Sequence, residues 1–233
     1  MHVRAHPTPI VPPLENGDRL TRDEFELRYH AMPHVKKAEL LEGEVYMGSP
    51  VSTEFHGAPH NDLGTWLGVY NASTRGVGVG DNSTVRLDID NEPQPDLFLF
   101  VRPDHGGRVV VDDDGYVNGA PELIVEVSAS RVSVDLGKRL HVYRRNQVAE
   151  YVVWRVYDAV VDWFVYRAGE FVTLPPDPAD GLLKSTTFPG LWLDAAALLR
   201  DDLGAVLAAL GRGVASPEHA AFAARLAARR PGA

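Results

Sequence analysis

The sequence predicts a mixed α/β protein of a single domain, with a central mixed β-sheet flanked by helices. Its 233 residues correspond to one domain at roughly 100–200 residues per domain. Two apolar segments, 95–101 and 121–127, are typical of strands buried on both faces of a sheet. Segments with a strand pattern alternate with segments of helical periodicity, as in sheets that are covered by helices.

The N-terminal elements begin with a proline-containing segment, 1–18, for which we expect an irregular lead-in. Thr21 and Glu24 have the spacing of a capping box and predict a helix that runs to about His30. Residues 38–47 then have a strand pattern, with a glycine where a hairpin would turn.

The middle of the chain carries helical and strand patterns in turn. Apolar residues three to four apart predict a helix over 55–71. A glycine-rich stretch, 76–80, precedes an alternating segment, 83–89, that predicts a strand. Residues 103–120 are polar and rich in Gly and Asp, so we expect a loop or a small hairpin. Residues 133–146 predict an amphipathic helix.

The C-terminal part predicts three further strands and two alanine-rich helices. The strands are expected over 151–156, 162–166 and 170–174, and the helices over 194–210 and 217–230. We therefore divide the chain into an N-terminal lead-in (1–18), a main domain (19–200) and a C-terminal helical extension (201–233).

The composition excludes several classes of protein. There are no cysteines, which excludes disulfide scaffolds, thiolate zinc sites and cysteine nucleophiles. The net charge is −9, so nucleic-acid binding would need a locally basic surface. No apolar run approaches the roughly 18 residues that span a bilayer, and the N-terminus lacks a secretory signal. We expect a cytoplasmic protein that has no membrane partner.

Two carboxylates interrupt the apolar strands. Asp96 precedes five apolar residues, and Glu126 lies inside an apolar run. An unpaired buried carboxylate costs several kcal/mol, so a cation, a shared proton or backbone hydrogen bonds must compensate each one. We expect each acid in the C-terminal half of its strand and the two strands side by side, so that the carboxylates converge. Two such oxygen donors suit Mg²⁺.

A polar stripe lies on the helix expected after the second strand. Asp135, Lys138, His141 and Arg145 are three to four residues apart and so share one face. This stripe could be a solvated face. Two acids and a lysine are nevertheless what metal-dependent phosphodiester hydrolysis requires, because the metal activates water and the lysine orients it or stabilises phosphate oxygens.

These motifs together resemble the PD-(D/E)XK nuclease superfamily and, within it, the Uma-two family of restriction endonucleases. The core of the resemblance is Pro95-Asp96, then Glu126-Val127-Ser128, then Asp135-x-x-Lys138. It covers roughly residues 20–200. Further matching pieces are Glu39–Glu44 with Ser49-Pro50, His56, Gly119–Pro121, Glu150–Trp154 and Phe188–Leu191.

The resemblance implies a restriction-endonuclease-like fold and a set of site residues. Asp96 and Glu126 would be metal ligands for Mg²⁺ or Mn²⁺, with the carbonyl of Val127 as a further ligand. Ser128 stands where the superfamily's simplest pattern has a lysine. Lys138, on the following helix, would supply the water-orienting cation.

Two more side chains, Glu44 and His56, are secondary candidates. Glu44 could support the ligands, and His56 could contact metal-bound water or phosphate. His56 could equally only cap or pack its helix, and Glu39 could be a surface residue of the hairpin.

The basic patch for a DNA backbone would consist of Arg131, Arg139, Arg144 and Arg145, although each arginine alone could be a solvated surface residue. Double-strand cutting would favour a two-fold homodimer, because its two sites would match the antiparallel strands.

The function that we predict is a metal-dependent endonuclease that hydrolyses phosphodiester bonds of DNA. The alternative is a catalytically weak or inactive nuclease-fold module that binds metal or nucleic acid without turnover. A glycosidase that uses Asp96 and Glu126 as its carboxylate pair is a weaker hypothesis, because such an enzyme has no use for Lys138. The sequence contains no recognisable reader helix, zinc finger or aromatic stacking platform.

Overall fold

The computed structural model describes residues 11–48, 52–129 and 132–229. The helical elements are α1 (Arg22–His30), η1 (Thr53–Gly57), α2 (Ala58–Ser73), η2 (Pro103–His105), η3 (Val134–Arg139), α3 (Leu140–Arg145), α4 (Ala195–Leu198), α5 (Leu203–Val214) and α6 (Pro217–Ala228). The strands are β1 (Ala38–Leu41), β2 (Glu44–Met47), β3 (Val77–Asp81), β4 (Val85–Arg86), β5 (Leu97–Val101), β6 (Val110–Val111), β7 (Val117–Asn118), β8 (Leu123–Ser128), β9 (Glu150–Arg155), β10 (Val160–Arg167), β11 (Glu170–Thr173), β12 (Leu183–Lys184) and β13 (Trp192–Leu193).

A six-stranded mixed sheet forms the centre of the protein, as the sequence predicts. Its order is β11-β10-β9-β8-β5-β3. Strands β8 and β9 are parallel, and the other neighbouring pairs are antiparallel. The two apolar segments seen in the sequence therefore become adjacent strands, β5 and β8, near the middle of the sheet.

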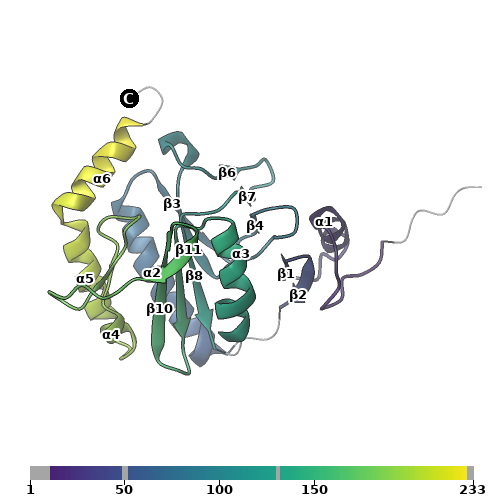
Figure 1. Ribbon diagram of the computed structural model, residues 1–233, viewed down its shortest axis with the longest axis horizontal. Coiled ribbons are helices and arrows are strands. Elements are labelled where there is room, and N and C mark those ends of the chain that lie inside the picture. The colour runs from purple at the N-terminus through teal and green to yellow at the C-terminus, as the bar shows by residue number, and fades with distance from the viewer. Residues whose placement is uncertain (1–10, 49–51, 130–131, 230–233) are drawn as a thin grey trace, which may run out of the picture.

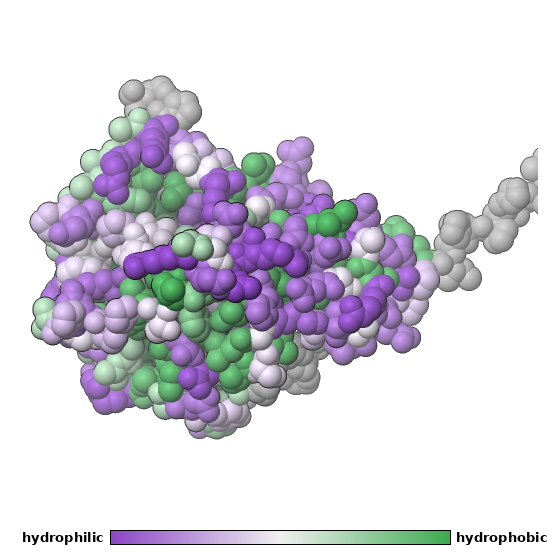
Figure 2. All heavy atoms as spheres, in the orientation of Figure 1, coloured by the Kyte–Doolittle hydropathy of each residue, from purple (hydrophilic) through white to green (hydrophobic). Residues whose placement is uncertain are grey.

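Helices cover both faces of this sheet. Successive residues of a strand point to opposite faces. Leu97 of β5 belongs to a buried cluster with Trp66 of α2, whereas Phe98 belongs to a second cluster with Tyr143 of α3. The sheet accordingly lies between α2 and α3 (Figure 1). On the face seen in Figure 2 the surface is mostly hydrophilic, with hydrophobic residues showing over the lower part of the sheet.

Strand β3 occupies the glycine-rich stretch, for which the sequence predicted no strand. Gly78 lies opposite Phe100 and Gly80 opposite Phe98 across the β3–β5 pair. A Cβ atom at Gly80 would lie 2.0 Å from the Phe98 ring, so only glycine leaves room for it. Local sequence pattern does not reveal this packing, because the rings belong to the neighbouring strand. The strand expected over 83–89 is reduced to β4.

Helix α1 and the β1–β2 hairpin form an N-terminal unit around their own buried cluster. Thr21 Oγ1 accepts the backbone N–H three residues further on, as the capping box predicts. The hairpin turns at Glu42 and Gly43, whose φ values of 52° and 71° are left-handed. Leu14 of the lead-in is buried in the same cluster as Phe25. This unit and α5–α6 lie at opposite ends of the molecule (Figure 1).

Two helices replace the single helix expected over 194–210. Asp201 has a left-handed φ of 61° after α4, and the side chain of Asp202 then caps α5 by accepting the N–H of Ala205. The C-terminal helices join the main buried cluster through Val206, Leu210, Phe222 and Leu226. No helix within the described ranges is long and apolar enough to cross a membrane.

Glu150 at the start of β9 is a structural carboxylate, and its loss should be costly. Its two oxygens accept hydrogen bonds from the indole N–H of Trp163 (3.0 Å), the hydroxyl of Ser185 (2.8 Å) and the backbone N–H groups of Thr186 (2.7 Å) and Thr187 (2.9 Å). We expect Glu150→Ala to lower the free energy of unfolding by about 3 kcal/mol, because it leaves several buried donors unpaired.

Urea denaturation followed by circular dichroism measures this effect. Glu218→Ala, at an exposed position of α6, is the control and should cost less than about 1 kcal/mol. Equal losses for the two variants would contradict the structural role of Glu150.

Candidate active site

Asp96 and Glu126 lie directly opposite each other on neighbouring strands. The β5–β8 register pairs Leu97 with Val125, and one step further along it places Asp96 opposite Glu126. The backbone N–H of Val127 donates to Asp96 Oδ2 (2.9 Å), and the N–H of Asp96 points at Glu126 Oε2 (3.4 Å). Both carboxylates are almost fully buried.

Asp96 and Glu126 lie close together, as expected, but Asp96 is not at the position in its strand that the sequence predicted. Asp96 immediately precedes β5 and is not in the C-terminal half of its strand, whereas Glu126 is near the end of β8. The start of one strand lies beside the end of the next because the two strands run antiparallel.

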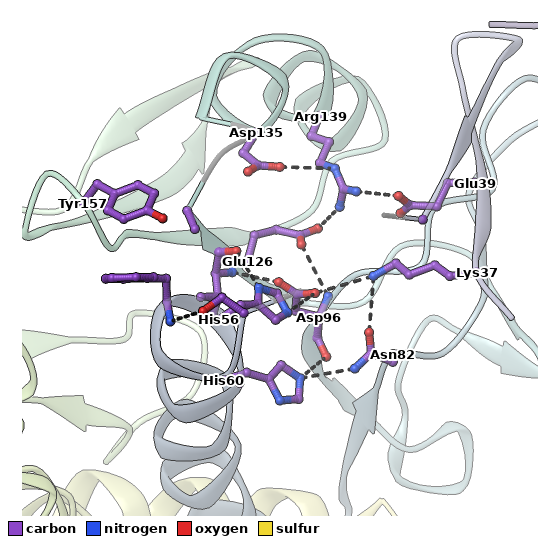
Figure 3. Close-up of a pocket in the computed structure, with 16 residues that line it drawn as sticks. Lys37, Glu39, His56, His60, Asn82, Asp96, Glu126, Asp135, Arg139 and Tyr157 are labelled. Atoms are coloured by element: carbon purple, nitrogen blue, oxygen red, sulfur yellow. Dashed lines mark hydrogen bonds and ion pairs between the residues drawn. The ribbon is translucent and has the colours of Figure 1, made fainter. Parts of the chain in front are cut away.

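Two basic side chains face Asp96 Oδ1 at distances longer than those of an ordinary hydrogen bond. Lys37 Nζ is 3.5 Å away and His56 Nε2 is 3.7 Å away. Lys37 also donates to the side-chain oxygen of Asn82 (3.2 Å), and His56 Nδ1 lies 3.2 Å from the carbonyl oxygen of Val127. Lys37 enters from the N-terminal unit and His56 from η1, which leads into α2, so three parts of the chain meet here (Figure 3).

Arg139 joins three buried carboxylates on the other side of Glu126. Its guanidinium bonds Glu126 Oε1 and Glu39 Oε2 (2.6 Å), and its Nε lies 3.3 Å from Asp135. The hydroxyl of Tyr143 also donates to Glu126 Oε1 (2.9 Å). Asp135, Arg139 and Tyr143 are successive members of an i, i+4 row, which places them on one face of the η3–α3 helix.

Burial sets the protonation behaviour of this cluster. It raises the pKa of Glu126, an effect that Arg139 opposes and that Asp96, Asp135 and Glu39 reinforce. The pKa of Asp135 is raised for the same reason. Burial alone would lower the pKa of Arg139, but the surrounding carboxylates raise it well above its usual value, so the guanidinium stays charged.

These side chains line a cavity of about 640 Å³, a size typical of ligand sites. Among the described residues, the acidic, basic and imidazole side chains along its wall are four carboxylates, two cations and two histidines. They are Glu39, Asp96, Glu126, Asp135, Lys37, Arg139, His56 and His60. The described part of the wall thus has more carboxylates than cations, which favours a positively charged ligand.

Lys138, which the resemblance implied as the water-orienting cation, does not line this cavity. Its Nζ is 2.9 Å from Glu44 and lies 5.0 Å from the ring centre of Tyr46. Lys138 and Arg139 are consecutive residues of the π-helical segment η3 and so point in different directions, Arg139 inward to Glu39 and Lys138 to Glu44 of the β1–β2 hairpin. Glu44 is likewise outside the cavity lining. The structure therefore brings together Asp96, Glu126, Val127 and His56, but neither Lys138 nor Glu44.

The four arginines expected to bind DNA have different surroundings. Arg139 is buried and paired, so it is not a surface contact for phosphate. Arg144 pairs with Glu170, and Arg145 lies near acidic side chains at 3.4 Å, beside a separate cavity. Arg131 lies outside the described residues.

The sequence did not predict several of the lining residues. It left open that Glu39 is a surface residue of the hairpin, but Glu39 is buried and pairs with Arg139. The i, i+4 spacing of Asp135 and Arg139 was a local signal for the inward face of their helix. Lys37 and Asn82 have no such signal, because their positions depend on how the hairpin and β3 pack.

The donor set suits a divalent cation in its chemistry. Asp96 Oδ1 and Glu126 Oε2 have only long contacts among the described residues, and the Val127 carbonyl has a second lone pair beside the one that faces His56. Mg²⁺ commonly takes one or two carboxylates and completes its shell with water and phosphate. Within the described part of the chain, no group of three or more His, Asp or Glu side chains is arranged to hold a metal ion.

The fold is similar to that of a solved protein described as a nuclease. The crystal structure of "a putative nuclease belonging to DUF820" from Anabaena variabilis ATCC 29413 superposes with a TM-score of 0.54 at 15% identity, covering 77% of this chain and 97% of that one. The chain belongs to the Uma2 family, described as "Putative restriction endonuclease", whose model matches residues 22–196. A search of curated proteins finds no match. Membership of this family indicates a nuclease.

Proposed function

We propose that the protein is an endonuclease that hydrolyses phosphodiester bonds of DNA with the help of Mg²⁺ or Mn²⁺. The observation that carries the proposal is the position of Asp96 opposite Glu126, inside a cavity whose wall has an excess of carboxylates. Family membership supports the same class of reaction.

Asp96 Oδ1, Glu126 Oε2 and the Val127 carbonyl would hold the cation. When bound, a divalent cation lowers the pKa of a coordinated water and neutralises charge on the phosphate. Arg139 and Tyr143 fix Glu126 through its other oxygen, and the Val127 N–H fixes Asp96 through Oδ2. The protein's contribution is thus to hold two carboxylates in place before the substrate arrives.

Lys37 is the cation that we assign to the substrate phosphate. Its ammonium lies in the cavity beside Asp96, its side chain is 32% exposed, and both of its contacts are longer than 3 Å. A charge that is loosely held and reaches solvent can move onto a phosphate oxygen and stabilise the negative charge that grows there during attack. Arg139 lacks this freedom because three carboxylates hold it.

His56 is suited to two tasks. One ring nitrogen faces the Val127 carbonyl and the other faces Asp96 Oδ1. It can hold the carbonyl in position, and it can accept a proton from water next to Asp96.

Double-strand cleavage would be carried out by a two-fold homodimer, because its two symmetric sites match the two DNA strands.

A second candidate is a nuclease-fold module that binds metal or nucleic acid without turnover. The ion pair between Arg139 and Glu126 favours it, because the pair already neutralises part of the charge that a metal would need.

Plasmid nicking distinguishes the two candidates. We expect supercoiled DNA to be nicked in Mg²⁺ or Mn²⁺ and to stay intact when EDTA removes the ion. DNA binding without nicking in either metal would support the module and contradict the nuclease.

The two lysines near the site give a matched pair of variants. We expect Lys37→Met to slow nicking by about 10²-fold, because one charged group that stabilises the transition state is lost. Lys138→Met should leave the rate within about threefold of wild type, because it removes only a partly exposed ion pair with Glu44. The measurement is the initial nicking rate of each purified variant, with thermal melting as the check on folding. A larger loss of nicking rate for Lys138→Met than for Lys37→Met would assign the catalytic role to Lys138 instead.

A further inference from the structure

Two aromatic side chains meet at the rim of the cavity. Phe55 comes from η1 and Tyr157 from the turn between β9 and β10, and their ring centres are 4.8 Å apart. Both line the same cavity as Asp96 and Glu126. Tyr157 is 63% exposed, so most of its surface faces solvent. In Figure 3 Tyr157 lies on the opposite side of the cavity from Lys37 and Glu39.

The exposed ring is not needed to hold its turn. Arg155 at the end of β9 forms ion pairs with Asp158 and with Asp162 of β10 (2.7 Å for the latter), and these bonds close the turn. Phe55 is half-buried, and its ring contacts the Tyr157 ring at an interplanar angle of 44°, while most of Tyr157 stays exposed. A large aromatic residue so exposed beside a polar cavity is typical of a ligand contact.

We propose that Phe55 and Tyr157 form a base-stacking subsite that holds an unpaired nucleobase next to the scissile phosphate. This inference rests on the proposed nuclease function. Every base has a π-face, and stacking on an aromatic side chain contributes about 1–3 kcal/mol per base without regard to sequence. A nucleotide whose phosphate lies at the carboxylate pair would have its own or the adjacent base within reach of the cavity rim.

The charges around the aromatic pair favour a base over the sugar-phosphate backbone. Glu54 precedes Phe55, and Asp158 follows Tyr157. The exposed Glu54 carboxylate repels phosphate but not an uncharged base, whereas the Asp158 carboxylate is already paired with Arg155. The backbone would instead run through the cavity towards Lys37.

The substrate class follows from this arrangement. A base inside a duplex is stacked on its neighbours, so its face becomes available only when it is unpaired or extruded at a cost of a few kcal/mol. We therefore infer that single-stranded DNA, or duplex DNA with an unpaired nucleotide, is preferred over a perfect duplex.

Binding of 2-aminopurine oligonucleotides tests the subsite without relying on cleavage. The protein is the wild-type full chain in Ca²⁺ buffer, because Ca²⁺ also takes oxygen ligands but activates water less than Mg²⁺ does, so the phosphate is held with little turnover. The probe is a short single-stranded oligodeoxynucleotide with one 2-aminopurine, whose fluorescence is quenched on stacking. On this background Tyr157→Leu removes the π-face at similar size, and Tyr157→Phe keeps it.

We expect Tyr157→Leu to weaken binding of the single strand by about 5-fold to 100-fold, and Tyr157→Phe to stay within about threefold. The perfect duplex of the same sequence should bind more weakly than the single strand and lose little with Tyr157→Leu. Equal binding by the Leu and Phe variants, or tighter binding of the duplex, would overturn the subsite.

The failure of this inference can be told apart from failure of the proposed function. If Tyr157→Leu nicks single-stranded and duplex substrates at the wild-type rate with metal present, the subsite is contradicted but the nuclease function is not. If the wild type neither binds nor cuts DNA of any form, both proposals fall.

Discussion

Replacement of Arg139 by methionine is expected to lower the free energy of unfolding by about 3–5 kcal/mol, because it leaves buried carboxylates without their cation. Glu39, Glu126 and Asp135 all depend on this guanidinium. The matched control is the preceding residue: Lys138→Met should cost less than about 1 kcal/mol, since its ion pair with Glu44 is partly exposed. Urea denaturation at neutral pH measures both.

The pH dependence of the Arg139→Met deficit provides a second check. Burial already raises the pKa of Glu126 and Asp135, and loss of the guanidinium raises both pKa values further. A carboxyl whose folded pKa lies above its unfolded value favours folding only while the folded state holds the proton. The deficit should therefore be small near pH 5 and grow as the pH rises through 7 to 8. A deficit that is independent of pH, or equal losses for the two variants, would contradict the network.

Asp96→Asn is expected to reduce metal-dependent nicking by roughly 10³-fold or more, because it removes one of the two charges that would hold the cation. The asparagine oxygen can still accept the Val127 N–H, so the fold should persist. Asp81→Asn is the control, since Asp81 ends the adjacent strand β3 but does not line the cavity. Its nicking rate should stay within about threefold of wild type, as expected for a largely exposed charge.

The measurement is the nicking rate in Mg²⁺ and in Mn²⁺, with thermal melting to confirm that each variant is folded. Full activity of Asp96→Asn would mean that other residues of the chain carry out the cleavage. An equal loss in both Asp variants would mean that general charge near the site, not metal binding, controls the rate.

The sheet and its carboxylate pair could be predicted from the sequence because their signals are local. Two apolar runs that are interrupted by Asp96 and by Glu126 predict buried strands in which each of these acids must be compensated, and the two side chains do meet. The capping box at Thr21 and the hairpin turn at Gly43 are similarly local. Strand β3 was missed because its glycines are explained by the rings of Phe98 and Phe100 on another strand.

The rest of the site depends on packing that no short pattern contains. The choice between Lys138 and Arg139 depends on which of these two consecutive residues faces the carboxylates, and the position of the β1–β2 hairpin decides it. Lys37 reaches the cavity because the hairpin is held beside it by the Leu40–Glu92 bridge and by the ion pair of Glu39 with Arg139. Phe55 and Tyr157 are far apart in the chain, so their meeting at the rim appears only in three dimensions.

Binding of Mn²⁺, measured by titration calorimetry, tests the central assignment most directly. Wild-type protein should take up one ion per chain at the carboxylate pair, whereas Asp96→Asn should lose that uptake and Asp81→Asn should keep it. Absence of Mn²⁺ and Mg²⁺ uptake by the wild type, or undiminished uptake by Asp96→Asn, would contradict the assignment of Asp96 and Glu126 as ligands of a catalytic metal.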